Sequence, residues 1–156
     1  MNSHDDSLAA PDETSAVHSF LREWTALDDP QVADRLLGPV ILVGGPSGTT
    51  ALARETFVRA VVGRQRAMAD LPAPRLGEVD VVRLGESRLV VTAHWRVAGP
   101  AGPLELVGDF LLERAAGPGL RALAYLPRTD VTAMAAAQAP VADEVDDEPE
   151  AGAVRS

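Results

Sequence analysis

Apolar and polar residues alternate along two neighbouring stretches of the chain, from Arg88 to Ala98 and from Pro103 to Arg114. An alternation of period two is typical of strands that bury one face. The tetrad Gly99-Pro100-Ala101-Gly102 lies between the stretches and is rich in turn-forming residues. This pattern predicts a β-hairpin.

The side chains favour one register for this hairpin. If Ala98 pairs with Pro103, opposite charges meet on one face of the sheet in the pairs Arg96–Glu105 and Arg88–Glu113, and Thr92 meets Asp109 between them. The other face is apolar and pairs Val97–Leu104, Trp95–Leu106, Ala93–Gly108, Val91–Phe110 and Leu89–Leu112. A slip of one residue would disrupt both faces. The sequence therefore predicts a sheet with one apolar face and one charged face.

Two more strands are predicted on either side of this hairpin. Apolar and polar residues alternate over 75–84, and a turn at 85–87 connects this strand to the hairpin. The second strand, 120–127, follows a turn at 117–119. With Arg114 opposite Leu120, Glu113 would face Arg121, and Asp109 would face Tyr125 on the charged face.

The first half of the chain has helical spacing instead. Thr14 or Ser15 caps a helix that reaches about Leu27, and its apolar stripe comprises Val17, Phe20, Leu21, Trp24 and Leu27. Asp29-Pro30 begins a short second helix that ends at 38–39. Residues 40–43 are a candidate for a buried strand. A third helix begins between 50 and 54 and reaches about 70.

Helices that precede a run of antiparallel strands predict an α+β domain whose helices cover the apolar sheet face. We expect three helices and at least four antiparallel strands. One such domain spans 15–138, with a loose helical turn at 130–138.

The order of these elements and several local phrases resemble the nuclear-transport-factor-two-like superfamily, in particular its SnoaL-like bacterial branch, over about residues 15–128. The phrases are VHSFLREWTALD, ILVGGPSGTTALARETFVRAVVGR, RLVVTAHWRVAGPAG, GDFLLER and GLRALAYL. The resemblance implies a curved antiparallel sheet that forms a cone around a pocket, closed by the three N-terminal helices. It also implies ligand binding or cofactor-free cyclase, isomerase or hydratase chemistry, and dimers formed through the outer sheet face. No catalytic motif carries over, because Leu126-Pro127 stands where many relatives end the last strand in a His- or Asp-bearing phrase.

Charge divides the chain into a neutral body and two acidic tails. The net charge is −9, and residues 1–14 and 139–156 together account for it. We expect both tails to be disordered and dispensable for folding, with residue 13 the last dispensable position at the N-terminus. The body has no overall basic surface for nucleic acid.

Composition narrows the location and the chemistry. The chain has no cysteine, no lysine and no apolar run long enough to span a bilayer, and all 14 basic residues are arginine. These features favour a cytoplasmic protein from a GC-rich bacterium. We also expect no membrane partner, no Schiff-base lysine and no cofactor.

Residues 44–50 resemble a phosphate loop but lack its lysine, so we expect a turn there. His4, His18 and His94 have no metal-ligand spacing, so we expect no metal site.

Four residues are candidate acids or bases. His94, Asp109 and Tyr125 would cluster on the charged face, where the alternative is a solvent or dimer face with ion pairs. Asp80 is the fourth, and its position depends on the turn after Leu84. A two-residue turn places Glu78 and Asp80 in the pocket, whereas a three-residue turn places both outside and fills the core better. Inside, Asp80 would be a general base with a raised pKa.

Large apolar side chains point to the interior and form the candidate ligand-binding set: Phe20, Trp24, Phe57, Met68, Trp95 and Phe110. They form either an ordinary core or the lining for an apolar or polycyclic ligand. Three functions remain open: a small-molecule binding protein, a cofactor-free cyclase, isomerase or hydratase, and a dimeric interaction module whose pocket is filled. The mixture of charged and apolar residues on the charged face predicts a homodimer.

Overall fold

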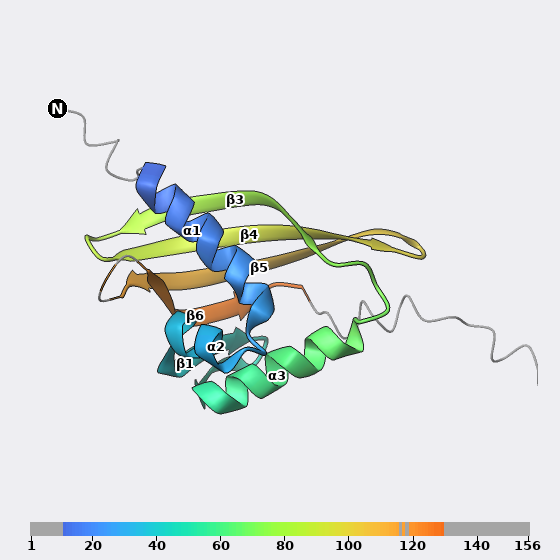
Figure 1. The fold of residues 1–156 in the computed structure, drawn as a ribbon, viewed down its shortest axis with the longest axis horizontal. Helices are drawn as coiled ribbons and strands as arrows, with labels where there is room; N and C mark the ends of the chain where they lie inside the picture. The colour runs from blue at the N-terminus through green and yellow to red at the C-terminus, as the bar shows by residue number, and fades with distance from the viewer. Residues whose placement is uncertain (1–10, 116, 118, 130–156) are drawn as a thin grey trace, which may run out of the picture.

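Helices cover one face of a six-stranded sheet in the computed structural model, which describes residues 11–115, 117 and 119–129 (Figure 1). The strand order is β2-β1-β6-β5-β4-β3. Helix α1 crosses the sheet over β3, β4 and β5, while α2 and α3 lie toward its β1 end (Figure 1). The elements, in chain order, are α1 (Pro11–Glu23), the 3-10 helix η2 (Trp24–Ala26), α2 (Pro30–Leu36), β1 (Leu37–Gly45), β2 (Gly48–Ala53), α3 (Arg54–Ala67), β3 (Arg75–Leu84), β4 (Arg88–Gly99), β5 (Gly102–Arg114) and β6 (Leu120–Pro127).

The predicted register of the central hairpin is confirmed. Ala98 pairs with Pro103, and all the predicted pairs down to Arg88–Glu113 follow. Gly99 pairs with Gly102, so the turn has two residues, and Gly102 adopts a φ of 127° that glycine tolerates best. As a result, Leu89, Val91, Ala93, Trp95 and Val97 are all buried on the helix-covered face.

The sheet is mixed rather than wholly antiparallel as predicted. Strands β3, β4, β5 and β6 pair with one another in antiparallel order. Strand β1 lies beside β6, the last of them, and pairs with it in parallel. Strand β2 was not predicted; it pairs with β1 through a tight turn at Pro46-Ser47, within the stretch expected to be a turn. The strand order has two ends, β2 and β3, so the sheet is open. The α+β class is confirmed, and the cone remains a prediction about the curvature of this sheet.

Helices α2 and α3 begin where the sequence predicts, whereas α1 begins at Pro11, so the predicted cap at Thr14 or Ser15 is wrong. The Asp29 carboxylate caps α2 by accepting a hydrogen bond of 2.9 Å from the Gln31 backbone N–H, with Pro30 in the first turn. Helix α3 begins at Arg54, at the end of the range predicted for it, and follows β2. None of the described helices is long and apolar enough to cross a membrane.

A bulge in β6 changes the face of one candidate residue. Leu112 pairs with Ala122 but Leu111 pairs with Ala124, so Leu123 is an extra residue in β6. A bulge of one residue moves every later side chain to the opposite face. Tyr125 consequently pairs with Phe110 on the apolar face, and the predicted pairing of Tyr125 with Asp109 is wrong.

The turn after β3 has three residues, because Leu84 pairs with Arg88. Val79 and Val81 therefore pack against the core, while Asp80 pairs with Thr92 and is exposed on the outer face. Glu78 is exposed as well, next to an irregularity in the β3–β4 pairing between Leu76 and Val79. The structure thus agrees with the alternative that places both acids outside.

The body of the domain begins earlier than residue 15. Helix α1 starts at Pro11, and Glu13 is only 8% exposed. Its carboxylate accepts a hydrogen bond of 2.7 Å from Arg83 at the end of β3 and another from Arg114 at the end of β5. Glu13 therefore belongs to a helix and joins it to two strands, and the prediction that it lies in a disordered tail is wrong. The predicted tails at 1–10 and 139–156, and the helical turn at 130–138, lie outside the described residues.

We expect Glu13→Gln to lower the free energy of unfolding by about 1–3 kcal/mol, because it leaves two guanidinium groups without their shared carboxylate. Urea unfolding followed by tryptophan fluorescence measures this change. The control is Glu23→Gln, which breaks an exposed ion pair with Arg35 and should cost less than about 1 kcal/mol. Equal effects of the two substitutions would show that Glu13 does not anchor α1.

Candidate functional site

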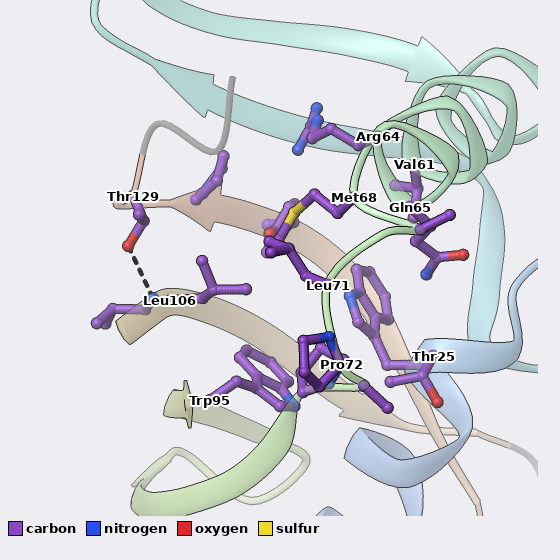
Figure 2. Close-up of a pocket in the computed structure, with 17 residues that line it drawn as sticks. Thr25, Val61, Arg64, Gln65, Met68, Leu71, Pro72, Trp95, Leu106 and Thr129 are labelled. Atoms are coloured by element: carbon purple, nitrogen blue, oxygen red, sulfur yellow. Dashed lines mark hydrogen bonds between the residues drawn. The ribbon is translucent and has the colours of Figure 1, made fainter. Parts of the chain in front are cut away.

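A pocket of about 350 Å³ lies between the end of α3 and the helix-covered face of the sheet (Figure 2). Four groups of residues line it. Trp24 and Thr25 come from η2, and Trp95, Leu106, Val107, Tyr125 and Pro127 come from β4, β5 and β6. Val61, Arg64 and Gln65 come from α3, and Met68, Ala69 and residues 71–74 come from the segment after it; Thr129 completes the lining.

The segment after α3 forms one wall of this pocket. Leu71 and Pro72 lie across the space from Trp95 and Leu106 in Figure 2. The prolines at 72 and 74 prevent the helix from continuing, so the chain leaves α3 and lines the pocket before β3 begins at Arg75. The sequence predicts only that the third helix ends near residue 70 and assigns this segment no role in a pocket.

The pocket backs onto a cluster of aromatic rings. The Trp24 ring lies within 6 Å of four others, with centroid distances of 5.6 Å to Phe20, 5.8 Å to Phe57, 4.8 Å to Phe110 and 5.3 Å to Tyr125. Among the described aromatic residues, only the Phe110 ring lies near Trp95, with a centroid distance of 6.1 Å. Trp24 is therefore held by the core on several sides, whereas Trp95 lies at the pocket wall.

The predicted ligand-binding set divides into two groups. Trp24, Met68 and Trp95 line the pocket. Phe20, Phe57 and Phe110 are buried behind it in the core and do not line it. Leu106, which also lines the pocket, could have been found from its predicted pairing with Trp95.

Sequence reasoning placed Tyr125 on the outer face, and it missed the other polar residues of the pocket, Thr25, Arg64, Gln65 and Thr129. A signal for two of them existed, because positions 64 and 65 fall on the same helical stripe as Phe57, Val61 and Met68. Polar residues within an apolar stripe often face a ligand rather than the core. Tyr125 had no such signal, because its position depends on the bulge at Leu123.

The candidate acid–base cluster does not form. His94 and Asp109 lie on the outer face and have other partners, while Tyr125 lies on the inner face. The His94 Nδ1 is 3.2 Å from a carboxylate oxygen of Glu105. Asp109 accepts hydrogen bonds from Thr92 at 2.5 Å and from Arg128 at 2.6 and 3.0 Å.

The catalytic roles predicted for Asp80, His94 and Asp109 therefore have no support from the pocket. None of the described residues that line it is acidic or a histidine. Among the described residues, no group of three or more acids and histidines is arranged to hold a metal ion.

Tyr125 is a pocket residue whose pKa is shifted by its surroundings. Burial raises the pKa of its hydroxyl above the ordinary value of 10.0, because the phenolate would lose its hydration, and the Arg64 guanidinium partly opposes this. Gly108 makes room for the ring, since a Cβ there would lie 3.0 Å from Tyr125 Cε1. Tyr125 is thus a neutral hydrogen-bond donor at the pocket wall.

Comparisons with known proteins support this fold. No protein-family model and no curated protein matches the sequence. Among solved structures, Aln2 from a Streptomyces species is 18% identical, with a TM-score of 0.57 over 83% of this chain and 99% of that chain. An NTF2-like protein from Cytophaga hutchinsonii is 16% identical, with a TM-score of 0.52 over 73% of this chain and 95% of that one.

A third neighbour is the CaMKII hub of S. rosetta, which is 15% identical, with a TM-score of 0.55 over 76% of this chain and 96% of that one. These similarities show that the chain has the nuclear-transport-factor-two-like fold, as its sequence pattern predicts.

Tyr125 is the only tyrosine in the chain, so its ionisation can be measured without labelling. We expect the ultraviolet absorbance of tyrosinate to appear at higher pH in the folded protein than in the chain unfolded by urea. Because the folded pKa is the higher one, this group's contribution to stability is present below pH 10 and is lost as the pH rises through the folded pKa. A folded protein that ionises at or below the pH of the unfolded chain would contradict the buried position of Tyr125.

Proposed function

We propose that this protein binds small apolar ring compounds in the pocket, as a member of the SnoaL-like class of the nuclear-transport-factor-two-like fold. The observation that carries this proposal is an open pocket of about 350 Å³ with both tryptophans of the chain, Trp24 and Trp95, in its wall. Its volume is within the range of about 300–1,000 Å³ typical of ligand pockets, near the lower end. A ligand of two or three fused rings fits this size and this lining.

The lining favours binding over the alternative of cyclase, isomerase or hydratase chemistry. Those reactions use a positioned general base, usually a carboxylate or an imidazole. The candidate bases Asp80, His94 and Asp109 project from the outer face, and the described lining residues include no acid and no histidine.

The pocket is also open rather than filled, which favours a ligand-binding protein over an interaction module alone. We propose a bacterial cytoplasm as the location, because the chain has no cysteine and all its basic residues are arginine.

We expect the neutral dye N-phenyl-1-naphthylamine to bind with a rise in its fluorescence, and Trp95→Ala to weaken that binding. Because one side of Trp95 already faces the pocket, Trp95→Ala should cost clearly less than the ~3–5 kcal/mol typical of emptying a filled core. Fluorescence titration and urea unfolding measure the two effects.

Leu84→Ala is the matched control for dye binding, because Leu84 is exposed on the outer face and should leave dye binding unchanged. If the parent protein does not bind the dye and Trp95→Ala costs a full ~3–5 kcal/mol, the pocket is an ordinary core and the interaction module becomes the better account.

The same proposal includes a homodimer formed through the outer sheet face. Strand pairing aligns an apolar row across this face, which comprises Val82, Val90, Leu111, Ala124 and Leu42. Val82 and Leu42, at the two ends of the row, are 51% and 45% exposed. A groove of about 430 Å³ lies along the row beside β1 and β6. An exposed apolar row between charged rows is the composition of an interface core with a polar rim.

Sedimentation equilibrium should show a dimer for the parent protein at micromolar concentration and a monomer for the double variant Val82→Glu, Leu42→Glu. The control is Ala60→Glu, which adds a negative charge at an exposed position of α3, away from the outer sheet face, and should remain a dimer. A parent protein that stays monomeric at high micromolar concentration would contradict the proposed interface.

A further inference from the structure

Arg64 is the cation of the pocket, and none of the ion pairs within the described part of the chain includes it. Its side chain leaves α3 beside Met68, with the guanidinium end directed away from the helix (Figure 2). Two other arginines near the helices have carboxylate partners: Arg54 pairs with Asp34 at 2.9 Å and Arg35 pairs with Glu23 at 2.8 Å. Arg64 is thus a partly buried cation at an apolar site, and the site itself supplies no anion.

The hydroxyl of Tyr125 belongs to the same site. Tyr125 lines the same pocket as Arg64, and the positive charge of Arg64 lowers the pKa of its hydroxyl against the larger effect of burial. A guanidinium and a neutral hydroxyl are both hydrogen-bond donors. Two donors at one site suit a ligand oxygen that carries negative charge, since such hydrogen bonds are about twice as strong as neutral ones.

We infer that the ligand of this pocket is an aromatic acid, whose ring system packs between Trp24 and Trp95 and whose carboxylate or comparable acidic oxygen is held by Arg64 and Tyr125. This inference rests on the proposed function and specifies its ligand class. Polar groups of this kind fix the orientation of a ligand in an otherwise apolar pocket.

The charge of the whole protein makes this inference sharply testable. The chain has a net charge of −9, so its long-range field repels anions. At physiological salt this field is screened within about 8 Å, whereas a contact in the pocket is screened much less. A preference for an anionic ligand must therefore come from a local cation.

The experiment compares 2-naphthoate with its neutral analogue 2-naphthamide by isothermal titration calorimetry at physiological salt, using the full chain. We expect naphthoate to bind at least ten times more tightly than naphthamide. Arg64→Gln should abolish this preference while naphthamide binding stays the same, which shows that the variant is folded. Tyr125→Phe should reduce the preference by a smaller factor.

Arg66→Gln is the matched control, because Arg66 is an exposed residue of α3 that does not line the pocket. It removes the same charge and should keep the preference. Equal affinity for the two compounds in the parent protein, or equal losses in Arg64→Gln and Arg66→Gln, would overturn the inference. If naphthamide binds but naphthoate has no advantage, the proposed function stands and only the ligand class is wrong. If neither compound binds, both proposals fail.

Discussion

The pairing of β4 with β5 determines which side chains face the helices and which face outward. Its two-residue turn leaves one register in which apolar residues share a face and opposite charges share the other. Trp95 and Leu106 therefore lie inside, while Arg96 and Glu105 lie outside. Because side chains alternate along a strand, every assignment in the neighbouring strands depends on this register and on the bulges that interrupt it.

The bulge at Leu123 places Tyr125 in the wall of the pocket. Without it, Tyr125 would lie on the outer face opposite Asp109, and the inner face would lose the ring that contacts Trp24 and Phe57. Gly108 supports the same arrangement, since its missing side chain leaves the space that the Tyr125 ring occupies. One extra residue in β6 thus moves Tyr125 from the predicted outer cluster to the pocket that Arg64 also lines.

Strong periodic patterns made much of the fold predictable. The hairpin register, the helix cap at Asp29, the α+β class and the apolar face all follow from local spacing and opposite charges. The parallel pairing of β1 with β6 did not follow, because it joins segments far apart in the chain and depends on long-range packing. The bulge was invisible for a related reason: Ala122, Leu123 and Ala124 are all apolar, so either register places similar residues in the core.

The site was less predictable than the fold. The aromatic set correctly included Trp24, Met68 and Trp95, but alternation alone could not separate a pocket wall from the core behind it, where Phe20 and Phe110 lie. The part of the wall at 71–74 contributes through the path of the chain after α3, which no residue pattern specifies. Arg64 interrupts an apolar helical stripe, and such interruptions are the signal to look for in similar sequences.

The most direct test of the account uses the two tryptophans as reporters, since the chain contains no others and both line the pocket. Protein labelled with 5-fluorotryptophan should give two fluorine NMR signals, assigned with Trp24→Phe and Trp95→Phe. The account predicts that added 2-naphthoate shifts both signals along saturating curves with one dissociation constant. Signals that stay in place while the compound is added to high millimolar concentration would contradict the claim that this pocket binds aromatic ligands.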